Sequence, residues 1–191
     1  MKKLIVVAMG GLSREREISF ITGKACSEAL KKKGYKVKEL DIKGDFINKL
    51  IKLKPKIVFN ALHGQYGEDG FVQSIFEILK IPYTHSGVIS SSLAMDKELS
   101  RKIFQKNNIN VPKYFMLDTN NKADLSKKVI RKLNFPVVIK PINEGSSVNV
   151  FICNESDIIK KLKILNEYKE ILIEKFIPGR EIQAAIIGKK K

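Results

Sequence analysis

The chain has 191 residues, a formal net charge of +16 and a hydrophobic content of 43%. This length suffices for one good core or two modest ones, and no apolar run is long enough to cross a bilayer. The positive charge comes from 31 lysines and only 5 arginines, spread along the whole chain. Nucleic-acid binding favours clustered, arginine-rich patches with interleaved aromatic residues, so we expect neither a nucleic-acid nor a membrane partner.

The first four residues, MKKL, are basic and then apolar, as in a secretory signal. The apolar run stops at Gly10-Gly11 without a small-residue cleavage site, and a charged stretch follows directly. We therefore interpret this segment as a first strand and expect a cytoplasmic protein. Cys26 and Cys153 show no metal-ligand spacing and are most simply reduced core residues.

The N-terminal part of the chain alternates between continuous apolar runs, which predict strands, and apolar residues at helical spacing. In chain order, the sequence predicts a strand over 4–9, a helix over 18–30, a strand over 37–42, a helix over 46–51, a strand over 57–62, a helix over 71–79 and a short strand over 82–84. Three such strand–helix units favour an α/β fold with a doubly wound parallel sheet, whose functional loops lie at the carboxyl ends of its strands.

A second unit is predicted to begin near Met95, which divides the chain into domains of residues 1–95 and 96–191. Strands now dominate and are close enough in sequence to pair locally, so this part is expected to be α+β. Its predicted elements are a helix over 97–106, a strand over 114–117, a helix over 125–133, a hairpin of strands 137–139 and 148–152, a helix over 155–165, and strands over 171–177 and 181–187. Nothing follows to cover the last strand, so the second domain is expected to be incomplete.

The stretch from Val137 to Val150, VVIKPINEGSSVNV, puts an amine at the end of a buried strand. Lys140-Pro141 ends the first apolar run, and the small loop Glu144–Ser147 precedes the second. Such a loop can turn backbone N–H groups toward an anion, so the pattern fits a grip on nucleotide phosphates. It fits an ordinary hairpin with a polar turn equally well, and these residues alone do not choose between the two.

Two loops carry polar side chains at the predicted carboxyl edge of the first sheet. Residues 10–17, GGLSRERE, put carboxylates at a helix start, which also fits simple helix capping with Ser13 as the N-cap. Residues 61–70, ALHGQYGEDG, contain three glycines, two acids and His63. A lone histidine is usually structural, but glycines permit close backbone approach at a strand end, which shifts the interpretation toward function.

Five stretches, taken in order, resemble one family: the D-alanine–D-alanine ligases of the ATP-grasp superfamily. They are GGxSxERExS at 10–19, ALHGxxGEDG at 61–70, PYTxSGVxxS followed by MDK within 82–97, VIKPxxEGSSV at 138–148, and IEKFIxGRE at 173–181. One motif alone would be weak, whereas five in the same order make chance agreement very small. The resemblance implies a substrate-binding, Rossmann-like pre-ATP-grasp domain over 1–95 and an incomplete α+β ATP-grasp domain over 96–191.

The resemblance also implies a two-step ligation that supplies peptidoglycan synthesis. ATP phosphorylates the carboxylate of one D-alanine, and the amino group of a second D-alanine attacks the acyl phosphate. By this resemblance Glu15 holds the ammonium of the first D-alanine, and His63 donates a hydrogen bond to that substrate or to the intermediate. Ser146 helps to orient substrate, which completes the expected catalytic set.

ATP is the nucleotide that the family uses, and the resemblance extends to its binding residues. The two implied lysines supply positive charge as phosphoryl charge develops, and the loop at 144–147 closes over the phosphates. Residues 174–177 edge the adenine, largely through backbone groups, and the last glutamate hydrogen-bonds the ribose. The implied ATP-binding residues are Lys97, Lys140, Glu144, Ser147, Glu174, Phe176, Ile177 and Glu181.

The family part that carries the Mg²⁺ ligands is expected to be absent, so no residue here is assigned to the metal. The resemblance implies Mg²⁺ as a cofactor and a homodimer for the complete enzyme, and the 191 residues alone are expected to be inactive. Two alternatives stay open: a truncated nucleotide-binding remnant without catalysis, and a ligase with another second substrate such as D-lactate. A dinucleotide-dependent dehydrogenase is disfavoured, because the chain lacks GxGxxG and Asp41 alone does not replace it.

Overall fold

A computed structural model describes residues 3–120, 125–185 and 188, which form two compact units. Unit 1 comprises the described residues of Met1–Val111 and Lys140–Val150, and unit 2 comprises those of Pro112–Ile139 and Phe151–Lys191. In this part of the chain, none of the helices combines the length and the hydrophobicity that a bilayer-spanning segment needs. The domain boundary expected at residue 95 remains a proposal.

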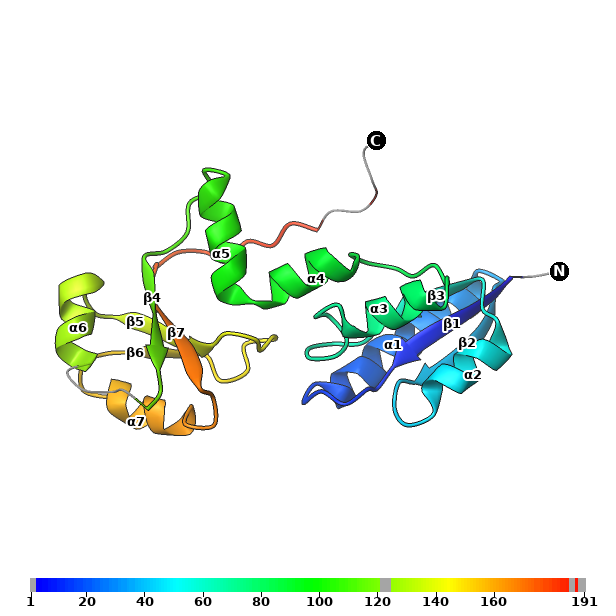
Figure 1. Ribbon diagram of the computed structural model, residues 1–191, viewed down its shortest axis with the longest axis horizontal. Helices are drawn as coiled ribbons and strands as arrows, with labels where there is room; N and C mark the ends of the chain where they lie inside the picture. The colour runs from blue at the N-terminus through cyan, green and yellow to red at the C-terminus, as the bar shows by residue number, and fades with distance from the viewer. Residues whose placement is uncertain (1–2, 121–124, 186–187, 189–191) are drawn as a thin grey trace. The chain divides into compact units, whose positions relative to one another are not determined.

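Unit 1 is built on a parallel three-stranded sheet, as predicted. β1 (Leu4–Met9) lies between β2 (Lys36–Asp41) and β3 (Ile57–Asn60), in the order β2-β1-β3 (Figure 1). The register aligns Ile5 of β1 with Val37 on one side and Ile57 on the other. Because β1 is paired along both edges and covered on both faces, its sequence is a continuous apolar run.

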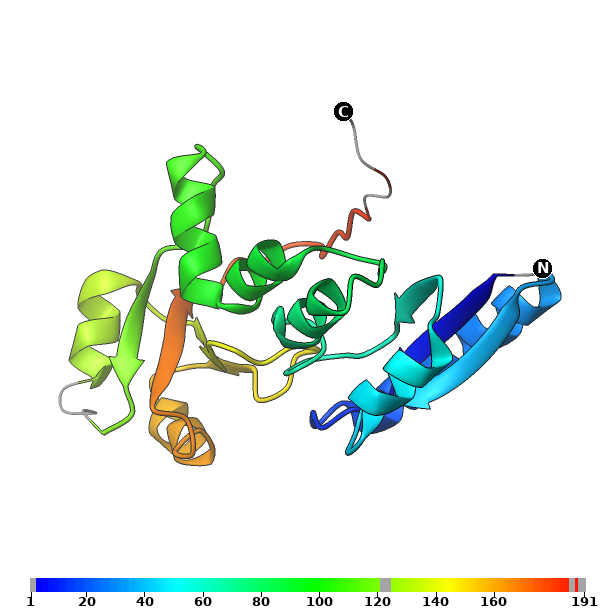
Figure 2. The ribbon, with the colours of Figure 1, turned by 45° about the vertical axis from the view of Figure 1, so that its right-hand side comes forward.

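Helices cover both faces of this sheet, which makes it doubly wound. α1 (Arg16–Lys32) packs on one face, and α2 (Phe46–Leu53) and α3 (Phe71–Ile78) pack on the other (Figure 2). The buried residues on the α1 face are Val7 and Met9 of β1 and Ala61 just after β3, which pack with Phe20 and Leu30 of the helix. The opposite face holds the larger core, which includes Val6, Ala8, Leu40, Leu50, Val58, Val72 and Phe76.

The segment after α3 differs in part from the prediction. Residues 82–84 form a single parallel bridge, between Tyr83 and Val58, instead of a strand. The sequence pattern does not predict α4 (Val88–Met95), because its serine-rich stretch has no amphipathic stripe. α5 (Lys97–Lys106) has the predicted bounds.

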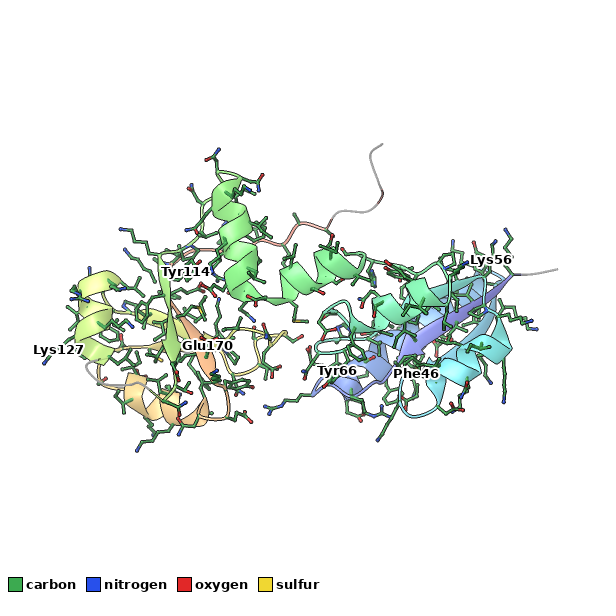
Figure 3. The ribbon with its side chains drawn as sticks, viewed as in Figure 1. Phe46, Lys56, Tyr66, Tyr114, Lys127 and Glu170 are labelled. Carbon is green, nitrogen blue, oxygen red and sulfur yellow. The ribbon has the colours of Figure 1, made fainter. Side chains whose placement is uncertain are left out.

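The second sheet has four strands in the order β4-β7-β5-β6. Its strands are β4 (Tyr114–Asp118), β5 (Val137–Pro141), β6 (Phe151–Cys153) and β7 (Glu170–Lys175). β4 pairs antiparallel with β7, and β5 pairs antiparallel with β6, so the hairpin predicted around the 140–150 loop is confirmed. Figure 3 labels Tyr114 and Glu170, the first residues of β4 and β7.

In unit 2, α6 (Leu125–Lys132) and α7 (Ile158–Ile164) share one apolar core with the strands. Every second residue of β4 and β5 points into this core, as the period of a strand requires. The α+β character predicted for this part is confirmed. The core includes Phe115, Leu117, Leu125, Val129, Leu133, Val137, Ile139, Cys153, Ile158, Leu162, Leu165, Ile171 and Ile173.

The predicted start of β6 is three residues too early. Ser146, Ser147 and Asn149 adopt left-handed backbone angles, with φ of 45°, 59° and 56°. The N–H of Val150 donates to the carbonyl of Ser147 at 3.3 Å, so the chain is still turning there. β6 therefore begins only at 151, and the polar loop is longer than the apolar pattern indicates.

The strand predicted over 181–187 is wrong for its described part. Residues 181–185 form no strand, and residues 186–187 lie outside the described residues. A strand needs a neighbour to satisfy its backbone groups, and 82% of Ile182 is exposed here. An apolar and alternating sequence is not sufficient without that partner.

Candidate functional site

Glu15 lies in the loop between β1 and α1, at the carboxyl end of the first sheet. Only 7% of this residue is exposed, and neither carboxylate oxygen has a hydrogen-bond partner among the described residues. A buried carboxylate that lacks partners is energetically costly. The start of α1 compensates for part of this cost, because a helix N-terminus carries partial positive charge. Glu15 is therefore suited to bind a cationic donor from outside the protein.

Two glycines pack against the carboxylate of Glu15. A Cβ on Gly64 would lie 2.5 Å from the Oε2 atom of Glu15, and one on Gly145 would lie 3.3 Å from it. Gly64 also has a φ of 68°, which favours glycine on conformational grounds. The loop after β3 and the loop after β5 thus both approach Glu15 within unit 1. A side chain at position 64 would displace the carboxylate.

Ser13 connects the two residues predicted to contact the first substrate. Its hydroxyl donates to the carbonyl of His63 at 2.7 Å and accepts a hydrogen bond from the N–H of Glu15 at 3.1 Å. α1 begins at Arg16, with Glu15 at the N-cap and no side-chain cap. The helix-capping interpretation of Ser13 is therefore wrong, because the hydroxyl joins two loops instead of closing the helix.

His63 follows β3 and is half-buried. Its Nε2 atom lies 3.0 Å from the hydroxyl of Thr22 on α1, which orients the ring. The loop is anchored further on, where the Nδ2 of Asn60 and the Nε2 of Gln73 each donate to the carbonyl of Gly67 at 2.9 Å. The ring of His63 is thus held by α1, and the loop that carries it is anchored at Gly67 by a buried amide network.

An apolar cavity of about 240 Å³ adjoins the same loops. His63 and Ser13 line it, whereas Glu15 does not. Phe46 of α2 and Tyr66 of the loop after β3 both line it, and Figure 3 labels these two side chains. His63 therefore belongs to the loop that packs on Glu15 and also to the wall of this cavity.

Lys97, the first residue of α5, contacts the 140–150 loop within unit 1. Its backbone N–H and its Nζ atom both donate to the carbonyl of Ile142 at 3.2 Å, and Nζ also donates to the carbonyl of Glu144. The loop then turns through Ser146 and Ser147 in left-handed conformations. Lys97 and the loop predicted to cover the phosphates are therefore joined directly.

Lys140 and Glu174 lie on neighbouring strands of the second sheet. On β5 the buried Val137 and Ile139 face the apolar core, so Lys140 faces the opposite side. On β7 the same alternation turns Glu174 away from the core, yet only 6% of this residue is exposed. Both side chains thus belong to the face of the sheet that the apolar core does not occupy.

The other residues predicted to bind ATP follow β7. The N–H of Phe176 donates to the carbonyl of Pro136 at 3.2 Å, which extends the pairing of β7 with the chain beside β5. Ile177 is 59% exposed, and Glu181 is exposed outside any strand. These residues are described within unit 2, separately from Glu15 and His63 in unit 1.

The residues predicted for the site do not form a metal centre. In the part of the chain that the structure describes, no group of three or more His, Cys, Asp or Glu side chains is arranged to hold a metal ion. Mg²⁺ takes oxygen ligands in an octahedron, of which the protein usually supplies one or two carboxylates while water and substrate phosphates supply the rest. The described residues therefore form no preformed protein cage for the Mg²⁺ that the resemblance implies.

Sequence reasoning missed the contacts that hold this site. Ser13 looks like a helix cap in the sequence, and Thr22 belongs to no motif. Helical spacing offers one signal, because Thr22 follows the buried Ser19 by three residues and so shares its face of α1. No comparable local signal points from Ser13 to His63, fifty residues along the chain.

Two family models match the chain, and together they span most of it. The model described as "D-ala D-ala ligase N-terminus" matches residues 47–86. The model described as "D-ala D-ala ligase C-terminus" matches residues 103–191. The two matched ranges follow one another in the order that their descriptions require.

Curated relatives match over the whole length of the chain. A D-alanine–D-alanine ligase from Pelagibacter ubique is 54% identical over 191 residues, which are 100% of this chain and 63% of that protein. One from Rickettsia canadensis is 45% identical over 99% of this chain and 52% of that protein. The chain thus spans between about half and two thirds of the length of these relatives.

Solved structures agree with these matches. The D-alanine–D-alanine ligase from Bacillus anthracis has a TM-score of 0.80 and 35% identity, covering 93% of this chain and 58% of that one. The same enzyme complexed with ATP has a TM-score of 0.76 and 34% identity, covering 93% of this chain and 60% of that one. The neighbours carry the ATP-grasp fold, as the resemblance implies. The chain belongs to the D-alanine–D-alanine ligase family.

Proposed function

We propose that the protein containing this chain joins two D-alanines in an ATP-dependent reaction. In the first step, the γ-phosphoryl group of ATP is transferred to the carboxylate of one D-alanine, which gives an acyl phosphate and ADP. In the second step, the amino group of the other D-alanine attacks the acyl carbon, a peptide bond forms and phosphate leaves. The dipeptide is a precursor for peptidoglycan.

The observation that carries this proposal is the buried carboxylate of Glu15, which lacks a hydrogen-bond partner among the described residues. An ammonium group supplies both the charge and the donors that such a carboxylate needs. A D-alanine bound through its ammonium keeps its own carboxylate available to the phosphoryl donor. Glu15 thus binds the first substrate at the atom that does not react.

His63 and Ser146 are proposed to complete the site around this substrate. Ser13 links the backbones of Glu15 and His63, which supports a common task for the two. Ser146 follows Gly145, whose α-carbon packs near the carboxylate of Glu15, so its hydroxyl belongs to the same region of unit 1. Hydrogen bonds from these side chains would orient the substrate and stabilise charge on the acyl intermediate.

ATP is the proposed phosphoryl donor, and the Bacillus anthracis structure with ATP supports this choice. Lys97 holds the carbonyl groups of the 140–150 loop, so we propose that it fixes this loop over the phosphates and adds positive charge there. Lys140 adds a second positive charge. Glu174, Phe176 and Ile177 would border the adenine, and the last ATP contact, Glu181, would bind the ribose.

Two further properties of the whole enzyme are part of the proposal. A cytoplasmic location suits a reaction that consumes ATP, and a homodimer is the assembly that the family resemblance implies. Both concern a whole enzyme, and this chain spans 63% of the length of the Pelagibacter ubique relative.

The test uses a completed ligase, in which this chain replaces the matching part of the Pelagibacter ubique enzyme. Incubated with ATP, Mg²⁺ and D-alanine, it is expected to release one ADP for each D-alanyl-D-alanine formed. L-alanine serves as the matched control and D-lactate as the competing second substrate. Release of ADP without dipeptide, or dipeptide at the same rate from L-alanine, would contradict the proposed function.

A further inference from the structure

An ion pair between Arg16 and Asp41 joins the start of α1 to the carboxyl end of β2. The Nη1 atom of Arg16 donates to Oδ1 of Asp41 at 2.8 Å, and Nη2 donates to Oδ2 at 2.5 Å. The guanidinium also stacks 4.6 Å from the ring centre of Phe20. This bidentate geometry fixes direction as well as distance, which a single contact does not.

The ion pair holds one peptide of the loop that leads to Glu15. The N–H of Gly11 donates to Oδ1 of Asp41 at 3.2 Å, and the carbonyl of Gly11 accepts from Nη1 of Arg16 at 2.7 Å. Gly10, with a φ of 74°, packs so closely on Asp41 that a Cβ would collide with its carboxylate. The loop is therefore shaped to receive the Asp41 side chain.

The sheet fixes Asp41 in turn. Asp41 is the register partner of Met9 in the β1–β2 ladder, and the N–H of Ile42 donates to the carbonyl of Met9 at 3.0 Å. The ladder thus continues up to the residue before Gly10. The sheet therefore fixes the position of Asp41 and, through Asp41, the position of the loop.

Glu15 depends on this backbone support, because no hydrogen bond holds its carboxylate oxygens among the described residues. The loop before it is fixed at Gly11 by the ion pair and at Ser13 by the carbonyl of His63. Two anchored points four and two residues before Glu15 leave its backbone little freedom. The position of the carboxylate is therefore set by the loop.

We propose that Asp41 is a positioning residue for the first substrate: through Arg16 and Gly11 it fixes the loop that presents the Glu15 carboxylate to the substrate ammonium. This inference rests on the proposed function. It gives a role to two residues outside the substrate contacts, one of which, Asp41, lies outside every motif of the family resemblance.

The chain supplies a matched control on the same strand and helix. Glu39 of β2 pairs with Lys31 of α1 at 2.8 Å, and its side chain is 38% exposed, as is that of Asp41. Glu39 also accepts from the hydroxyl of Ser27 at 2.6 Å, and in the described part of the chain its hydrogen bonds go to Ser27 and Lys31 of α1 and not to the loop before Glu15. Glu39→Ala therefore removes a similar ion pair between α1 and β2 and leaves the contacts of the loop intact.

The first experiment measures amide hydrogen exchange in the 191-residue chain, with Asp41→Ala and Glu39→Ala compared. Asp41→Ala is expected to speed exchange of the Glu15 amide by about tenfold, because local opening of the loop becomes easier. Glu39→Ala is expected to leave that amide unchanged. Asp41→Asn, which retains an acceptor for Gly11, gives a smaller change and serves if the alanine variant fails to fold. Equal exchange of the Glu15 amide in the Asp41 and Glu39 variants would overturn the inference.

The second experiment measures kinetics in the completed ligase. Asp41→Ala is expected to raise the KM for the first D-alanine by about tenfold and to leave the KM for ATP unchanged, because a misplaced contact group weakens only the substrate that it touches. Glu39→Ala is expected to change neither. An inactive parent enzyme would count against the proposed function, whereas an active parent with equal KM values in both variants would overturn only the role of Asp41.

Discussion

The apolar core of unit 2 is a single cluster, whereas unit 1 has an apolar layer on each face of its sheet and several buried polar groups beside them. Among the described residues, the buried polar side chains of unit 1 are Glu15, Ser19, Ser27, Asn60, Gln73 and Ser91. Those of unit 2 are Thr119 and Glu174. The two units therefore differ in what they bury: unit 2 buries mainly apolar side chains, whereas unit 1 also buries several polar ones.

Several of the buried polar groups of unit 1 hold loops at the strand ends. The hydroxyl of Ser19 accepts from the N–H of Gly10 at 2.9 Å and donates to the carbonyl of Ala61 at 2.7 Å, so α1 ties the ends of β1 and β3 together. Asn60 does the same for the loop after β3. Glu15 is the contrast, because its carboxylate holds no part of the described protein. The polar contacts of unit 1 therefore surround one buried carboxylate that has no hydrogen-bond partner among the described residues.

The largest effect is expected from the core of unit 2. Leu162→Ala removes a fully buried side chain of α7 and should lower the free energy of unfolding of this unit by about 3 kcal/mol. Ile159→Ala, on the exposed side of the same helix, should cost less than about 1 kcal/mol. Urea unfolding followed by circular dichroism measures both. Equal losses would mean that the apolar core does not dominate the stability of unit 2.

A second prediction concerns pH and the same core. Burial raises the pKa of the Cys153 thiol from 9.0 to about 11. Because the folded state favours the neutral thiol, its contribution to stability is complete below pH 9 and is lost as the pH rises toward 11. The unfolding free energy should therefore fall more steeply over this window in the parent chain than in Cys153→Ala. Identical pH slopes for the two chains would contradict the burial of this thiol.

A third prediction separates the nucleotide residues from the general positive charge. In the completed ligase, Lys140→Ala is expected to weaken ATP binding by about tenfold, because a lysine beside the phosphates stabilises charge that a distant one cannot. Lys32→Ala, in the exposed last turn of α1, should leave ATP affinity unchanged. Binding of an ATP analogue by calorimetry measures both. The same affinity in both variants would remove Lys140 from the ATP site.

Much of the fold is predictable from local sequence, and the exceptions share a cause. β1 matches its predicted bounds because an apolar run ended by glycines is a strong local signal for a strand. α5 matches because an aspartate before an amphipathic stretch is a strong local signal for a helix start. β6 and residues 181–185 differ because strand formation depends on turns and partners elsewhere in the chain. Local periodicity in the sequence indicates neither these turns nor these strand partners.

The candidate site is predictable only in its motif residues. Glu15 and His63 stand out because they lie in loops at strand ends, where parallel sheets bring functional groups together. Asp41 also ends a strand, but its proposed role becomes apparent only from its contacts with Arg16 and Gly11 in the structure. Contacts between residues 25 or 30 positions apart have no periodicity in the sequence, so the supporting frame has to come from the structure.

The central claim is that Glu15 is a buried charge kept for a ligand and not for the fold. Its most direct test is the free energy of unfolding of the 191-residue chain carrying Glu15→Gln, with the exposed Glu17→Gln as control. Glu15→Gln should raise the unfolding free energy of unit 1 by about 1 kcal/mol, because it removes, at nearly constant volume, a buried charge that the helix start compensates only in part. Glu17→Gln should leave it unchanged or slightly lower, since it removes a favourable charge at a helix start. A clear loss of stability in Glu15→Gln would show that the carboxylate supports the fold, and would contradict the account.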